Sequence, residues 1–129
     1  MKVVYIEPNK QAVIKEISPG LESMQDIVGG YIQAIYPFDD PVALVCNDEG
    51  KINGLELNRG LTDDNGDLYD IIAGTFFICL ARPESEDFES LTDELASKYL
   101  NMFRYPELFM WVNDKIIAFK KGDVTWNTL

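Results

Sequence analysis

The sequence contains no histidine and only two cysteines, and these absences exclude most common catalytic designs. Without imidazole there is no serine–histidine or cysteine–histidine pair and no histidine ligand for a metal. Cys46 and Cys79 are too far apart for a CxxC motif, and neither a GxxxxGKS/T phosphate loop nor a GxGxxG motif is present. An enzyme would have to use carboxylates, lysine, tyrosine or a bound metal. The sequence therefore favours a protein that is not an enzyme and needs no cofactor.

Basic residues are scarce as well. Eleven lysines and arginines stand against 22 aspartates and glutamates, which gives a net charge of −11. A negative surface repels the phosphate groups of nucleic acids and of anionic membranes. We therefore expect no direct binding of either, whereas a cationic protein partner is compatible with this charge. Solubility alone is the alternative explanation for so acidic a composition.

Long hydrophobic runs are also missing. The longest run, residues 71–81, contains Gly74 and Thr75 and is shorter than the roughly 20 apolar residues that span a membrane. The first residues lack the apolar stretch and cleavage site of a secretory signal. These features predict a cytoplasmic protein whose two cysteines are buried and reduced.

The length of 129 residues fits a single domain, residues 1–129. In the first part of the chain, short apolar runs alternate with turn-forming residues, and a pair of glycines follows a stretch with helical spacing. The expected elements are a hairpin of residues 3–6 and 11–17, a helix over 18–29 that begins at Ser18-Pro19 and ends at Gly29-Gly30, and strands over 31–38 and 42–47.

The second part of the chain is richer in polar turns. Its expected elements are a weak strand over 52–57, an exposed loop over 58–67, a buried strand over 68–80 that bends at Gly74, an acidic loop over 82–89, a helix from Thr92 to before Pro106, and a tail with a helical turn and a strand over 115–119. Two helices and about six strands joined by tight turns predict an α+β fold with a largely antiparallel or mixed sheet.

Several polar residues are candidates for a ligand site. Asp39 and Asp40 lie between two prolines, Asp70 precedes an apolar pair, and Asn58-Arg59 interrupts an apolar region. An arginine near carboxylates can form a small polar pocket, so we predict that the other four residues gather around Arg59. The alternative is that Arg59 only forms an ion pair with a neighbouring aspartate, which contributes about 0–1 kcal/mol when exposed.

A calcium site is not predicted. Asp63, Asn65 and Asp67 have the spacing of the first three ligands of a calcium-binding loop. The glycine of that motif is displaced, however, and Gly74 stands where the bidentate glutamate belongs. We expect an Asn-Gly turn with solvated carboxylates and no metal.

Two further patterns concern partner binding. Residues 39–70 and 84–94 are strongly acidic, and if they share one face, that face could imitate the phosphate backbone of DNA. The alternative is an ordinary solvated surface. The C-terminal part also holds four aromatic residues that either bind a partner or pack on the core. These are Phe109, Trp111, Phe119 and Trp126.

Three segments carry a family resemblance. They are VGGYIQAIYPFDDPVALVCNDEGKINGLELNR (28–59), YDIIAGTFFICLA (69–81) and KYLNMFRYPELF (98–109). In this order they resemble the domain-of-unknown-function 3846 family, small proteins of bacteria, phages and conjugative elements, mostly in Gram-positive lineages. The family has no established activity, so the resemblance implies no site residues. It implies an accessory protein of mobile DNA.

Two functional hypotheses follow. The first is a small, non-enzymatic interaction protein that binds a host or element-encoded protein, with DNA mimicry as its narrower form. The second is a small-molecule-binding domain or a carboxylate-dependent enzyme with a pocket near Arg59. The sequence leaves the oligomeric state open.

Overall fold

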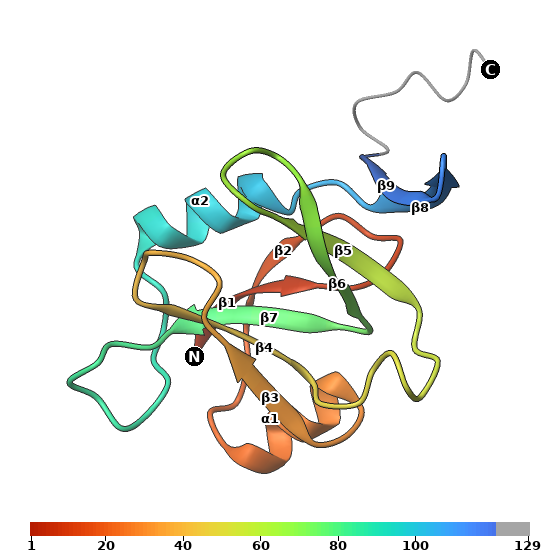
Figure 1. Ribbon diagram of the computed structural model, residues 1–129. Coiled ribbons are helices and arrows are strands. Elements are labelled where there is room, and N and C mark those ends of the chain that lie inside the picture. The colour runs from red at the N-terminus through yellow and green to blue at the C-terminus, as the bar shows by residue number, and fades with distance from the viewer. Residues whose placement is uncertain (121–129) are drawn as a thin grey trace.

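A five-stranded antiparallel sheet forms the centre of the protein in the computed structural model, which describes residues 1–120 (Figure 1). In pairing order its strands are β2 (Val13–Glu16), β1 (Lys2–Ile6), β7 (Phe76–Leu80), β4 (Val42–Asn47) and β3 (Ile32–Ile35). Of the three inner strands, β4 and β7 are buried along their whole length. This explains their largely continuous apolar sequences, because a strand covered on both faces has no solvent-exposed face that would carry polar residues.

The two faces of the sheet bury separate cores. Successive side chains of a strand point to opposite faces. Phe77 packs with Val28 of α1 (Leu21–Val28), whereas Phe76 and Ile78 pack on the other face with Tyr99 of α2 (Asp93–Met102). Neither helix within residues 1–120 is long and apolar enough to cross a membrane.

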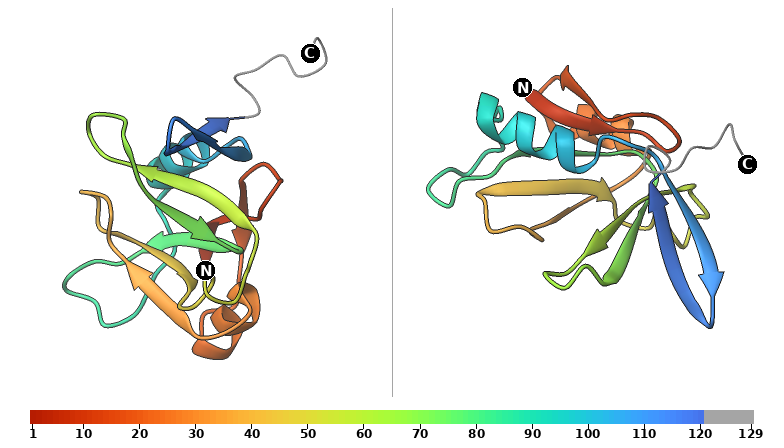
Figure 2. Two further views of the ribbon diagram at one scale, coloured as in Figure 1. Left: turned by 45° about the vertical axis from the view of Figure 1, so that its right-hand side comes forward. Right: turned by 90° about the horizontal axis from the view of Figure 1, so that it is seen from above.

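Two β-hairpins complete the described structure. β5 (Leu57–Thr62) pairs with β6 (Leu68–Ala73), and β8 (Glu107–Val112) pairs with β9 (Lys115–Lys120). The first hairpin contributes Leu61 and Ile72 to the core that Tyr99 shares. The hairpins are close together at their bases, where β5 meets β8, and diverge towards their turns in the right-hand view of Figure 2. The antiparallel strands and two helices confirm the predicted α+β class.

Several expected elements are confirmed. The N-terminal hairpin forms between β1 and β2. Gly29 ends α1 in the left-handed conformation with φ 80°, and Thr92 caps α2 by accepting a hydrogen bond from the Leu95 N–H. Cys46 and Cys79 are buried and free, as predicted. The predicted cap at Ser18-Pro19 is wrong, because α1 begins at Leu21 after Gly20 and has no side-chain cap.

The largest error concerns residues 52–67. The predicted strand over 52–57 is a series of turns, and half of the predicted loop over 58–67 is the strand β5. Asn58 and Arg59 resemble loop residues by type, yet their side chains are 1% and 0% exposed. Both are hydrogen-bonded to backbone carbonyls inside the protein, which satisfies polar groups that would otherwise require water.

Two further corrections concern chain reversals. Gly74 does not bend one continuous strand, because β6 and β7 belong to different sheets, and Gly74 at φ 83° turns the chain between them. Residues 107–112 form a strand and not the expected helical turn. Asn113 and Asp114, with φ 51° and 64°, form the tight turn of this hairpin. The sequence pattern there was ambiguous because residues 108–112 are all apolar.

Candidate functional site

The β8–β9 hairpin is apolar on both faces. Its cross-strand register places Phe109 and Trp111 on the face opposite to Leu108 and Met110. The inner face, towards β5–β6, consists of Glu107, Phe109, Trp111, Ile116, Ala118 and Lys120. The outer face consists of Leu108, Met110, Val112, Lys115, Ile117 and Phe119. Met110 is 53% exposed, and Trp111, towards the turn on the inner face, is 73% exposed.

The base of the hairpin is attached to β5 at Gly60. The Gly60 N–H donates a 2.8 Å hydrogen bond to Oε1 of Glu107. A Cβ at Gly60 would lie 3.5 Å from the Phe109 ring and 2.4 Å from Cδ1 of Leu68. The missing side chain therefore leaves room for Leu68 of β6, whereas Phe109 of β8 lies at an ordinary contact distance from this position.

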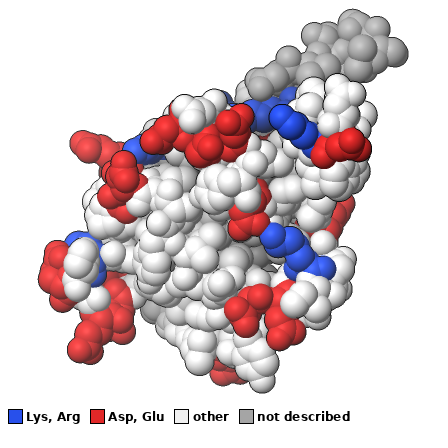
Figure 3. Space-filling model, in the orientation of Figure 1, with Lys and Arg blue, Asp and Glu red and all other residues white. Residues whose placement is uncertain are grey.

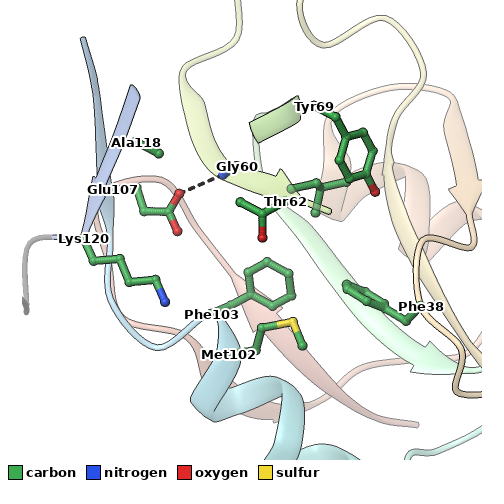
Figure 4. Close-up of a pocket in the computed structure, with 10 residues that line it drawn as sticks. Phe38, Gly60, Thr62, Tyr69, Met102, Phe103, Glu107, Ala118 and Lys120 are labelled. Carbon is green, nitrogen blue, oxygen red and sulfur yellow. Dashed lines mark hydrogen bonds between the residues drawn. The ribbon is translucent and has the colours of Figure 1, made fainter. Parts of the chain in front are cut away.

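A small cavity of about 160 Å³ lies at this base (Figure 4). Its lining combines aromatic and aliphatic side chains with three polar ones, Thr62, Glu107 and Lys120. Glu107 is 9% exposed, and its carboxylate lies between β5 and the hairpin, as Figure 4 shows. Burial raises the pKa of Glu107, against the opposing effects of the Gly60 N–H and of the Arg59 and Lys120 charges.

A larger groove of about 900 Å³ opens from the base towards the hairpin turns. Its walls come from β6 and β9, and apolar side chains dominate them. Acidic residues lie at Asp67 beside one turn and at Asp114 in the other. Asp70 also lines the groove, where Oδ1 accepts a 2.6 Å hydrogen bond from Nζ of Lys51.

Arg59 is a structural residue in the interior. Its Nε and Nη2 donate to the Phe103 carbonyl at 3.1 and 3.0 Å, and Nη2 also donates to the Lys10 carbonyl at 2.6 Å. Nη1 donates to Oδ1 of Asn58 at 2.8 Å, and Asn58 in turn donates to two carbonyls. Burial lowers the pKa of Arg59 to about 10, which leaves it charged at neutral pH.

Arg59 therefore holds three segments together. It joins β5 to the end of α2 and to the connection between β1 and β2. It does not form the expected ion pair with an aspartate within residues 1–120, and it lines neither the cavity nor the groove.

The other predicted site residues lie in different places. Oδ2 of Asp40 accepts hydrogen bonds from Nζ of Lys98 at 2.6 Å and from the Tyr99 hydroxyl at 2.7 Å, and these bonds lower the pKa of Asp40. Asp39 beside it is exposed. The structure thus brings Asn58 to Arg59, and in the described part of the chain no hydrogen bond or ion pair connects Asp39, Asp40 or Asp70 to them.

The Asp63–Asp67 loop is a hydrogen-bonded turn. Oδ1 of Asp63 accepts the N–H groups of Asn65 and Asp67 at 2.9 Å each. This geometry explains the calcium-like spacing without a metal. Residues 1–120 contain no group of three or more acidic or cysteine side chains arranged to hold a metal ion.

Acidic side chains on the face seen in Figure 3 form separate groups, and lysines or arginines lie beside several of them. Ion pairs account for part of this mixing. They include Lys2–Asp93, Lys51–Asp70, Lys98–Asp40, Arg82–Glu84 and Arg82–Glu89. On this face the acidic groups do not form one continuous stripe.

The sequence pattern indicates Trp111 but neither Glu107 nor the groove. A usable signal was present, because six residues on each side of Asn113-Asp114 can pair as a hairpin with that turn. Trp126, the fourth aromatic residue of the predicted patch, lies outside the described residues.

Comparison with protein families finds a match. A family model described as "Domain of unknown function (DUF3846)" matches residues 1–104. The matched part contains α2 and Arg59, whereas the β8–β9 hairpin follows it. Searches of curated proteins and of solved structures find no match.

Proposed function

The chain belongs to the DUF3846 family, and on that premise we propose that it is a small acidic interaction protein that binds a protein partner through the β8–β9 hairpin and the adjoining groove. The observation that supports this most strongly is the hairpin with two apolar faces. A two-stranded sheet is only marginally stable in water on its own. Exposed apolar patches on such elements are typical of interaction sites.

Catalysis by the cysteines is disfavoured. Both thiols are buried, and burial raises the pKa of Cys46 to about 11 and that of Cys79 to about 12. The thiolate is the nucleophilic form, and it is therefore scarce at neutral pH. A role in binding is also consistent with the lack of histidine.

The cellular setting remains a proposal. The sequence resemblance suggests an accessory factor of a phage or conjugative element, acting on a host or element-encoded protein in the cytoplasm. DNA mimicry is the narrower version, and the separate acidic groups in Figure 3 give it less support than the apolar hairpin gives to ordinary protein binding.

Affinity capture with matched variants tests the proposal. Full-length protein and the variants Met110→Asp and Ile52→Asp would each be incubated with a lysate of the cells that make it. Met110 lies on the outer hairpin face, whereas Ile52, 84% exposed, lies in the turns before β5. We expect a partner that Met110→Asp loses and Ile52→Asp retains. Capture of no partner, or equal capture by all three proteins, would contradict the proposal.

The cavity at Glu107 supports a second candidate function, the binding of a small molecule. A nine-tenths-buried carboxylate with one oxygen on Gly60, beside Thr62 and Lys120, is an unusual feature of an otherwise apolar cavity. A thermal-shift screen of metabolites, nucleotides and metal ions would detect it, because a ligand at 100 times its Kd adds about 2.7 kcal/mol. A hit should disappear in Glu107→Gln, and a flat response over the whole screen would exclude this function.

A further inference from the structure

We infer that the groove between the two hairpins binds a short apolar peptide segment that carries lysine or arginine at the end nearest the hairpin turns. This inference rests on the proposed function and specifies the chemistry of the partner.

The walls of the groove require an apolar ligand. Tyr69 on β6 is 56% exposed, and Trp111 on β8 is 73% exposed. Leu57, 41% exposed, and Ile116 extend the same surface. Large aromatic side chains that lose their exposed area on binding are the residues that most often dominate the affinity of an interface. A polar peptide segment would not provide apolar contacts for these exposed side chains.

The mouth of the groove requires positive charge. Asp67 in the turn of the first hairpin and Asp114 in that of the second line the groove, and Asp63 and Asp64 belong to the same turn as Asp67. None of these four forms an ion pair among residues 1–120. Lys115 is the neighbouring cation in the groove lining, since Lys51 is engaged by Asp70. The excess of carboxylates attracts a lysine or arginine within roughly one Debye length, about 8 Å at physiological ionic strength.

A second copy of the chain is a poorer occupant. Each copy would bring a net charge of −11, and its hairpin turns would place further carboxylates near those of the first. Like charges at an interface oppose association. A basic segment from another protein has the opposite charge and avoids this cost.

The test begins with peptide selection on the full-length protein. A displayed library of random peptides about ten residues long, roughly 33 Å when extended, would be selected against immobilised protein. We expect enrichment of aromatic and aliphatic residues next to lysine or arginine. The best peptide and its Lys/Arg→Glu version would then be synthesised, and their affinities measured at low and moderate salt.

A charge exchange provides the decisive measurement. The double variant Asp67→Lys, Asp114→Asn should bind the basic peptide about tenfold more weakly and the acidic version more tightly than the wild type does. The control Glu86→Lys, Asp87→Asn makes the same change in net charge on an exposed loop away from the groove, and it should bind both peptides as the wild type does. Equal weakening by both double variants would overturn the inference, because only the overall charge would then matter.

Trp111 reports which occupant fills the groove. In a full-length Trp126→Phe background it is the sole tryptophan, and its emission should shift to shorter wavelength when the basic peptide binds. Emission that shifts to shorter wavelength as the protein concentration rises, without peptide, would indicate that a second copy fills the groove. Emission already at short wavelength at high dilution would indicate that a segment of the same chain fills it. Either result would overturn the inference.

Failure of the inference is distinguishable from failure of the proposed function. If selection yields no peptide, or apolar peptides without basic residues, the predicted ligand chemistry is wrong. A partner that Met110→Asp loses would still support protein binding by the hairpin.

Discussion

At the scale of single residues, the most consequential feature is Arg59, a buried arginine that forms no ion pair among residues 1–120 and is held by backbone carbonyls. Removing one member of a buried hydrogen-bonded charge set leaves the remaining groups unsatisfied, and this costs more than the bonds themselves contribute. The Phe103 and Lys10 carbonyls would lose their donors if Arg59 were replaced. Arg59 therefore determines how β5 is held against the rest of the molecule.

Replacement of Arg59 should be strongly destabilising. We expect Arg59→Met to lower the free energy of unfolding by about 3 kcal/mol, because the buried carbonyls lose a charged donor. Arg59→Lys should also destabilise, because an ammonium group cannot reproduce the planar set of donors. Urea denaturation would measure both. Arg82→Met, at an exposed arginine, serves as the control. A urea midpoint that changes no more in Arg59→Met than in Arg82→Met would refute this role.

Glu107 should give the protein a pH-dependent stability of unusual sign. Its pKa is raised in the folded state, so between the unfolded and folded pKa values the folded protein holds more protons. Stability then falls as pH rises from about 4.5 through the folded pKa. Glu107→Gln keeps the acceptor for the Gly60 N–H and lacks this titration. We expect its free energy of unfolding, relative to wild type, to increase over that range, and a constant difference across pH 4–7 would contradict the assignment.

The sequence predicted residue environments only where local pattern decides them. Thr92 was identified as a helix cap because its hydroxyl oxygen accepts from the N–H of Leu95, only three residues further along the chain. The environment of Arg59 depends on carbonyls 44 and 49 residues away, which no local pattern records. The predicted site around Arg59 therefore joined residues that the fold places apart.

At the scale of elements, the tight β8–β9 turn controls the hairpin. Asn113 and Asp114 both adopt positive φ, as a type I′ turn requires, and glycine is the preferred second residue of such turns. Both helices and the β1–β2 hairpin were predicted, although α1 begins at Leu21 and the polar residues 58–67 were expected to form a loop and not part of the β5–β6 hairpin. β8 was not predicted, because residues on both of its faces are apolar and the alternation that identifies a half-buried strand is absent.

Changing that turn should alter the hairpin and little else. We expect Asp114→Gly to stabilise it by about 0.5–1 kcal/mol, since glycine adopts the left-handed conformation without a steric penalty. Asp114→Val should destabilise it, because a β-branched residue is poorly tolerated at φ 64°. Hydrogen exchange of the β8 and β9 amides would measure both effects. Equal protection in the two variants would show that the turn does not limit hairpin stability.

At the scale of the whole molecule, the strand order could not be predicted from local patterns. β1 pairs with β7, seventy or more positions further along the chain, and the sheet that results places α1 and α2 on opposite faces. Pairing over such a separation depends on which apolar surfaces fit together. The net charge, in contrast, is known from the sequence. The arrangement of the charged side chains on the surface depends on this strand order.

The excess of negative charge should make stability increase with salt. With 22 acidic and 11 basic residues, repulsion between carboxylates acts over most of the molecule when the Debye length is about 30 Å, at 0.01 M salt. At 0.15 M it falls to about 8 Å, which screens long-range repulsion while close pairs such as Lys98–Asp40, at 2.6 Å, are screened less. The urea midpoint should therefore rise between these salt concentrations, and equally in sodium chloride and potassium fluoride if screening is the cause. A midpoint that falls would mean that attractive pairs dominate the folded state.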